Sequence, residues 1–379
     1  MDMIVVATAA LLTVAALPYV VYVGLYALVA PSGTPASTDE AEPTVSILLP
    51  TYDEADIIER KLANLCALDY PMERVEVVVA DSSDDETPTL VRDFFADRDA
   101  PSLTLVEIES RGVARAINSA MKAVSGEVVF RTDADSELAD DALRVAAANL
   151  DDTEVGAVTG RQADVLGDSE VEQDYRDILS RLQALESHLD STFICHGPCF
   201  AFERDNFVPI APDSLADDTE IGVGVRRGGD RVVMDPEMRF VESGVSSFTE
   251  RRTRKDRRAM GLVQLLLRNR DLLGRHGRYG RVVLPFNWWF MVVSPWLAVL
   301  TAVVVTAAAV SVAGAWGLAI PVLAVAFGWL GQSDRLGSIQ PLHAVVDAQV
   351  SLLVAQVRLV RGDVTGTWEV DRGSREAFE

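Results

Sequence analysis

The chain has 379 residues and carries 57 Asp and Glu against 34 Lys and Arg, a formal charge of −23. A hydrophobic fraction of 49% excludes a disordered acidic tail, and the negative charge argues against general binding to nucleic acid. Three cysteines are too few for a disulfide-stapled secreted scaffold. Because only three of the basic residues are lysines, the composition suggests a chain kept soluble at very high salt, as in halophiles.

The first 30 residues predict a transmembrane helix. No charged residue occurs from Met3 to Ala30, a length that at about 1.5 Å per residue is ample for a bilayer. The basic start of a signal peptide is missing, so we expect residues 1–30 to be a retained membrane anchor. Residues 31–43 are rich in Pro and Ser and predict a polar linker.

Residues 44–250 alternate short β-branched runs with helical segments. The predicted strands are Val45–Leu49, Val75–Val79, Leu103–Glu107 and Val128–Phe130. The predicted helices between and after them cover residues 57–68, 87–95, 114–124 and 140–150. This alternation predicts an α/β fold, a mainly parallel sheet covered by helices.

Residues 251–281 form a basic juxtamembrane segment with eleven Lys or Arg and two Asp. The uncharged stretch Val282–Ser333 follows it and is long enough for two transmembrane helices joined by a turn near residues 311–317. By the positive-inside rule, the basic segment places residues 36–281 in the cytoplasm of a multi-pass cell-membrane protein. Anionic membrane lipids are an expected contact of this segment.

Residues 334–379 predict an interfacial amphipathic helix and a C-terminal tail. The helix is expected over Ala344–Val360, where Asp347 and Arg358 leave only ten uncharged residues between them. Its apolar face is formed by Val346, Val350, Leu353 and Val357. A helix lying on the membrane is therefore favoured over a third full span.

Carboxylates follow three of the four predicted strands, as Asp53 and Glu54, as Asp81, and as Asp133 and Asp135. Since parallel strands end at one edge of a sheet, where ligands bind, we expect these side chains to lie close together. The pair Asp133 and Asp135 has the i, i+2 spacing that can hold a hard divalent cation. For any single Asp, a helix cap or a turn is the alternative.

Five motifs in chain order carry a resemblance to a known family. They are Val45–Glu54 (VSILLPTYDE), Val79–Thr87 (VADSSDDET), Gly112–Asn118 (GVARAIN), Gly126–Asp135 (GEVVFRTDAD) and Asp217–Glu220 (DDTE). The pattern resembles the family 2 nucleotide-sugar glycosyltransferases of the GT-A fold over roughly residues 44–262. It departs from that family at Asp53, where Asn is commoner, and at Val113, which replaces a lysine.

The resemblance implies a role for each matched position in binding a nucleotide-sugar donor. Pro50, Thr51, Glu54 and Asp81 would line the base and ribose pocket, Asp133 would face the ribose or sugar, and Asp135 would bind Mg²⁺ or Mn²⁺. The metal would neutralise the charge on the leaving diphosphate. Arg111 and Arg115 are candidates to assist it, with ordinary surface arginines as the alternative.

Asp218 is the expected general base. It would take the proton of an acceptor hydroxyl as that oxygen attacks the anomeric carbon from the face opposite the diphosphate, which inverts the configuration. The alternative is that Asp217 and Asp218 only cap a helix over residues 219–227.

The resemblance weakens before the membrane helices. Processive polysaccharide synthases of the family carry Gln-x-x-Arg-Trp there, and this chain has Arg254-Lys-Asp-Arg-Arg258. Arg257 matches and is expected to contact a diphosphate, but the sugar-stacking aromatic is missing. This favours transfer of one or a few sugars to a membrane-held acceptor, a lipid-linked glycan or a glycolipid. A processive synthase and a non-catalytic sugar-nucleotide-binding scaffold are the alternatives.

Overall fold

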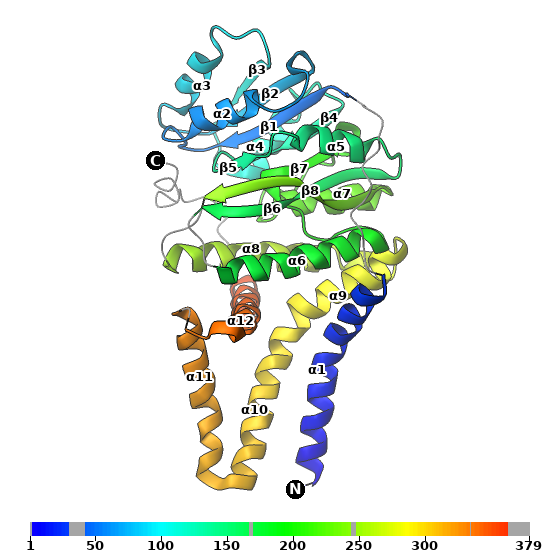
Figure 1. Ribbon diagram of the computed structural model, residues 1–379, viewed down its shortest axis with the longest axis vertical. Coiled ribbons are helices and arrows are strands. Elements are labelled where there is room, and N and C mark those ends of the chain that lie inside the picture. Colours follow the sequence, from blue (N-terminus) through cyan, green and yellow to red (C-terminus); the bar gives the residue numbers. More distant parts are fainter. Residues whose placement is uncertain (1, 30–41, 167–169, 244–247, 334, 363–379) are drawn as a thin grey trace.

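The computed structural model describes residues 2–29, 42–166, 170–243, 248–333 and 335–362 (Figure 1). Most of the predicted linker and the C-terminal tail, residues 363–379, lie outside these ranges. The chain forms a sheet-containing body with apolar helices extending from one side of it (Figure 1).

The body is built on a single sheet of eight strands within the described residues, in the order β3-β2-β1-β4-β7-β6-β8-β5. The strands are β1 (Val45–Thr51), β2 (Val75–Asp81), β3 (Ser102–Glu107), β4 (Val128–Arg131), β5 (Ser136–Leu138), β6 (Val155–Leu166), β7 (Phe200–Glu203) and β8 (Arg231–Ser243). The first four are parallel, as are β6 and β8, while β7 and β5 are antiparallel to their neighbours. The predicted mainly parallel α/β fold is confirmed.

Helices cover both faces of the sheet because its strands are apolar on both sides. In β1, Ile47 and Leu49 pack on one face and Leu48 on the other. The first face is covered by α2 (Ile58–Cys66), α3 (Thr87–Phe95) and α5 (Ala142–Leu150), the second by α4 (Val113–Ala120) and α7 (Asp217–Gly228). The four predicted strands and the four helices α2 to α5 are confirmed, with helix ends shifted by up to four residues.

Three described stretches are long and apolar enough to cross a membrane, Val6–Val29, Tyr279–Gln332 and Gly337–Arg361. They contain α1 (Asp2–Val29), α9 (Leu284–Trp288), α10 (Ser294–Ala313), α11 (Ala319–Gln332) and α12 (Gln340–Arg361). Helices α1, α10 and α11 extend away from the sheet on the same side (Figure 1). The hydroxyls of Tyr19 and Ser294, 2.9 Å apart, join α1 to α10.

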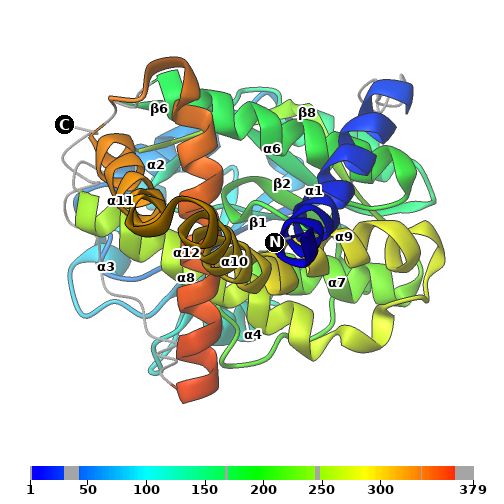
Figure 2. The same cartoon turned by 90° about the horizontal axis from the view of Figure 1, so that it is seen from below.

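Helix α12 runs in a different direction from α10 and α11. Seen from below, α10 and α11 are viewed along their axes, while α12 runs across them (Figure 2). It packs against α8 (Phe248–Arg268), which lies beside α6 (Glu170–Leu189) under the sheet (Figure 1). Leu352 and Ala355 of α12 share a buried core with Val263 and Leu266 of α8.

Candidate active site

The loops after β1 and β2 are fixed to each other by two aspartates. The buried Asp81 accepts hydrogen bonds from the hydroxyls of Thr51, at 2.7 Å, and Ser83, at 2.6 Å. Asp53 has a φ of 52°, a left-handed conformation that Asp tolerates better than most residues. Its carboxylate accepts the backbone N–H of Asp84 at 2.9 Å. Asp81 is therefore positioned to orient these two loops.

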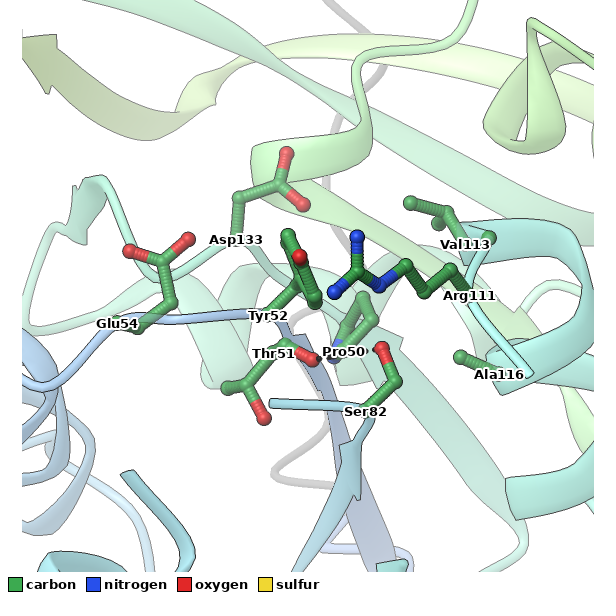
Figure 3. Close-up of a pocket in the computed structure, with 10 residues that line it drawn as sticks. Pro50, Thr51, Tyr52, Glu54, Ser82, Arg111, Val113, Ala116 and Asp133 are labelled. Atoms are coloured by element: carbon green, nitrogen blue, oxygen red, sulfur yellow. Dashed lines mark hydrogen bonds between the residues drawn. The ribbon is translucent and has the colours of Figure 1, made fainter. Parts of the chain in front are cut away.

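A cleft opens above these loops, at the carboxyl end of β1 (Figure 3). It is lined by Pro50, Thr51, Tyr52, Glu54, Ser82, Arg111, Gly112, Val113, Ala116 and Asp133. Four residues predicted to bind the donor, Pro50, Thr51, Glu54 and Asp133, thus come together. Tyr52 and Arg111 form one wall, with the guanidinium carbon 4.9 Å from the ring centroid. Arg111 is also ion-paired with Asp84.

Arg131 joins the Asp133 loop to the start of α7. Its buried guanidinium binds both oxygens of Asp133, at 3.0 and 2.9 Å, and Asp217 at 3.1 Å. Burial opposes the charge of Arg131, but Asp133 and Asp217 outweigh it and raise the pKa of the guanidinium. The sequence motifs did not identify this residue as part of the site.

Lys61 of α2 supports the same loop from below and was also missed. The residue is 1% exposed, and its ammonium group donates hydrogen bonds to the Thr132 hydroxyl at 2.8 Å and the Ser136 carbonyl at 2.7 Å. Burial lowers its pKa to about 7, although Asp133 and Asp135 favour the charged form. The sequence held one signal, since Lys61 is one of only three lysines in a chain rich in arginine.

Asp135 is partly buried near Asp133, and its carboxylate is 3.4 Å from the guanidinium of Arg254. Burial and the neighbouring Asp133 raise the pKa of Asp135 to about 6, because both disfavour a second negative charge. The described residues include no cluster of three or more His, Cys, Asp or Glu that could hold a metal. Two carboxylates fit a Mg²⁺ or Mn²⁺ ion that takes its remaining ligands from phosphate oxygens and water.

Asp218 is held by backbone N–H groups from two elements. One carboxylate oxygen accepts from Gly197 at 2.7 Å and the other from Thr219 at 2.6 Å. Burial, reinforced by Asp217, raises the pKa of Asp218 to about 6. Helix α7 begins at Asp217 with Ala216 at its N-cap position, so neither aspartate is the N-cap residue, although Asp218 accepts the first-turn N–H of Thr219.

The two remaining predicted donor contacts have different environments. Arg257 is half-buried on α8 between Arg254 and Arg258, and burial together with these two charges lowers its pKa. Arg115 is exposed on α4 and is not among the residues that line the cleft. Arg257 lies near the active-site carboxylates, since Asp217 and Asp133 act on its pKa.

The parallel sheet, the cleft at its carboxyl edge and the adjoining Asp133–Asp135 loop define a glycosyltransferase of the GT-A type. Two family models match the chain, "Glycosyl transferase family 2" over residues 46–208 and "Glycosyl transferase family group 2" over residues 128–330. The second covers more than half of the chain, which belongs to the family 2 glycosyltransferases. The family resemblance of the five motifs is confirmed.

Curated relatives match part of the chain. An N-acetylglucosaminyltransferase of Rhizobium meliloti is 31% identical over 169 residues, 43% of this chain and 39% of that protein. A poly-beta-1,6-N-acetyl-D-glucosamine synthase of Staphylococcus aureus is 26% identical over 209 residues, 53% of this chain and 50% of that protein. The chain thus spans half or less of the length of these relatives.

A solved structure matches nearly the whole chain. It is a mannosyltransferase from Pyrobaculum calidifontis, determined in complex with GDP-Man and Mn²⁺. The likeness covers 93% of this chain and 97% of that one, with 28% identity and a TM-score of 0.79.

Proposed function

We propose that the protein transfers a sugar, with inversion, from a nucleotide-diphosphate sugar to a hydroxyl of a membrane-held acceptor, a lipid-linked glycan or a glycolipid. The observation that carries this proposal is the position of Asp218. Its partly buried carboxylate is linked through Asp217 and Arg131 to Asp133, which lines the cleft. The proposed base is thereby linked to a residue that lines the cleft.

The donor would lie in the cleft with its base and ribose against Pro50, Thr51 and Glu54. Asp135, with Asp133 beside it, would hold Mg²⁺ or Mn²⁺ and the diphosphate oxygens. Bound there, the metal supplies charge neutralisation of the departing nucleoside diphosphate. The Pyrobaculum calidifontis relative, in complex with GDP-Man and Mn²⁺, supports this assignment.

Asp218 would accept the proton of the acceptor hydroxyl while that oxygen attacks the anomeric carbon. A carboxylate whose pKa is raised to about 6 is a stronger base than an ordinary Asp and is still ionised at neutral pH. Arg131 keeps its positive charge between Asp133 and Asp217 and so limits their repulsion of the base. Arg257, half-buried between Arg254 and Arg258, is the side chain we assign to the diphosphate.

The apolar helices support a multi-pass enzyme of the cell membrane. We propose that α1 and the pair α10–α11 span the bilayer, that the sheet domain is cytoplasmic, and that α12 lies on the membrane surface. The basic segment 251–281 would face anionic lipids. The direction of α12, across α10 and α11, supports the surface position (Figure 2).

A processive polysaccharide synthase is the second candidate, because the Staphylococcus aureus relative bears that kind of name. Arg258 stands where synthases have the sugar-stacking Trp, which favours short products. Chain lengths formed from a radiolabelled donor would separate the two functions, since a synthase gives long polymers at low donor conversion.

The test is a transfer assay with UDP-, GDP- and dTDP-sugars and extracted membrane lipids in vesicles that contain the full-length protein. Asp218→Asn should lower the rate by about 10²- to 10⁴-fold, the size of a lost general base, without changing donor affinity. Asp213→Asn, which removes an exposed pair with Arg268, is the matched control. Normal turnover by Asp218→Asn would remove the assignment of the base.

A further inference from the structure

Helix α12 has an exposed apolar stripe. Leu342, Val346 and Val350, one turn apart, are 58%, 42% and 45% exposed. The buried face, by contrast, contains Leu352 and Ala355, which pack on α8. A helix that buries one side in protein and shows a continuous apolar stripe on another is suited to lie in the surface of a lipid layer.

The contact of α12 with α8 is also ionic, and its centre is Asp347. This carboxylate, 15% exposed, lies 2.6 Å from a guanidinium nitrogen of Arg252 and 3.3 Å from the ammonium of Lys255. Arg252 in turn binds the buried Asp256 at 3.1 Å, and Arg358 of α12 is 3.9 Å from Asp256. Partly buried pairs of this kind are screened by salt much less than surface pairs.

The same helix is joined to the start of the transmembrane hairpin. The amide of Gln349 donates to the Phe290 carbonyl at 3.3 Å, and that of Gln356 to the Met291 carbonyl at 3.0 Å. Both carbonyls belong to a π-helical turn, η6 (Trp289–Val293). Such turns interrupt the regular hydrogen bonds of a helix, so partners from a neighbouring helix are needed. Helix α12 therefore connects α8 with the membrane helices.

The opposite face of α8 belongs to the active site. At 100° per residue, the side chains at 252, 255 and 256 share one face and those at 254, 257 and 258 share the other. On the second face Arg254 binds Asp135 at 3.4 Å and Arg258 is 3.5 Å from Glu242. A shift of α8 relative to α12 would therefore move these arginines relative to Asp135.

We propose that Asp347 is a positioning residue, the ionic link through which the membrane-bound α12 holds the arginine face of α8 against the active-site carboxylates. This proposal rests on the proposed function in that Arg257, on this arginine face, serves the diphosphate. It ties the geometry of the site to the contact of α12 with lipid, at a residue that contacts no substrate.

The experiment compares full-length variants in vesicles. Asp347→Asn should lower kcat for lipid acceptors by about tenfold or more, as expected for a small displacement of a charge-stabilising group. Asp347→Glu should recover most of the rate because it keeps the charge. In an Arg254→Ala background Asp347→Asn should have little further effect, because residues that act through one another are not additive. Asp213→Asn removes a pair to Arg268 at the far end of α8 and should be neutral.

Hydrogen–deuterium exchange of residues 254–262 gives a readout that needs no acceptor. Asp347→Asn should speed exchange in this part of α8, and Asp347→Glu should not. A kcat within twofold of the wild type, additive losses with Arg254→Ala, or unchanged exchange would overturn the proposal. If the wild type transfers sugar to no lipid, the proposed function fails, and exchange in α8 still decides the role of Asp347.

Discussion

Asp135 and Asp218 both have a pKa raised to about 6, but their surroundings suit them to different tasks. Asp135 owes its shift to burial and to Asp133, a second carboxylate two residues away, so a cation would relieve the repulsion. Asp218 has one backbone N–H on each oxygen, which fixes its orientation. A fixed carboxylate of raised pKa suits proton transfer, while a repelled pair suits a metal.

The pH dependence of transfer follows from the raised pKa of Asp218. A base must be ionised, and a carboxylate with a pKa of about 6 is already protonated at pH values where an ordinary Asp is still charged. We expect kcat/KM for transfer to be level near pH 7.5 and to fall about tenfold per pH unit well below pH 6. Protonation of Asp135 would lower the rate at low pH as well, because it would weaken metal binding.

The measurement is the initial rate between pH 4.5 and 8, with saturating Mn²⁺, set beside donor binding over the same range. Asp213→Asn should reproduce the wild-type profile. A rate that stays constant down to pH 5 would show that no group with the raised pKa of Asp218 limits the reaction.

The residues of the site differ in how far the sequence could predict them. Pro50, Thr51, Glu54 and Asp133 follow strands and could be placed by motif and by the common edge of a parallel sheet. Lys61 could not, because its partner Thr132 is 71 residues away and the contact exists only after α2 has packed on the sheet. Buried polar groups that meet across elements leave no local pattern.

The turn that carries Gly197 connects Asp218, the proposed general base, to the rest of the site. Its N–H reaches Asp218, and a Cβ on this residue would overlap the guanidinium of Arg131. Gly197→Ala should therefore displace Arg131 from Asp133 and Asp217. We expect at least a tenfold loss of transfer, because a shift of about 1 Å in a site can cost more than that.

Gly224→Ala is the matched control for Gly197→Ala. Gly224 lies within α7. A Cβ added there would have the Cβ of Val208 as its nearest neighbour, 3.9 Å away. Alanine should be neutral there or stabilise the protein by about 0.5–1 kcal/mol, since Gly weakens a helix interior. Equal activity of the two variants in the transfer assay would contradict the role of the Gly197 turn.

The proposed surface position of α12 leads to a prediction about the membrane topology of the chain. If α1 and the pair α10–α11 span the bilayer and α12 lies on its surface, the C-terminus is on the same side as the sheet domain and the N-terminus on the other. If α12 were a third span, the C-terminus would lie on the opposite side of the membrane from the sheet domain. A cysteine-reactive impermeant dye applied to sealed right-side-out vesicles should label a cysteine tag at the N-terminus and leave one at the C-terminus unlabelled. Detergent should expose the C-terminal tag to the dye.

The elements themselves were predictable where the periodicity was clean. β1 and β2 are short apolar runs buried on both faces, and they were found from sequence. β6 and β8 contain several charged residues, and their pairing shifts register at three places. Since a register shift breaks the two-residue alternation, no regular pattern marks these strands over their full length. The part of the sheet that contains β6 and β8 therefore emerges only from tertiary structure.

The net charge of −23 is spread over the whole molecule, because few of the acidic residues lie in the candidate active site. Glu109, Asp151, Asp152 and Glu154 are among those exposed on the body. At low salt these like charges repel over about 10 Å, and at 1 M they are screened within about 3 Å. Self-repulsion weakens the compact state, so the protein should need concentrated salt for full stability.

We expect the thermal unfolding midpoint of the full-length protein to rise by about 5 °C or more between 0.1 and 3 M KCl, a gain of roughly 2 kcal/mol for a domain of this size. Transfer activity at a fixed temperature should rise with it. Sucrose at matched osmolality is the control, because it favours compact states without screening charge. A midpoint that is highest at 0.1 M KCl would contradict the halophilic interpretation. A rise in sucrose equal to that in KCl would assign the effect to exclusion from the protein surface instead of to charge.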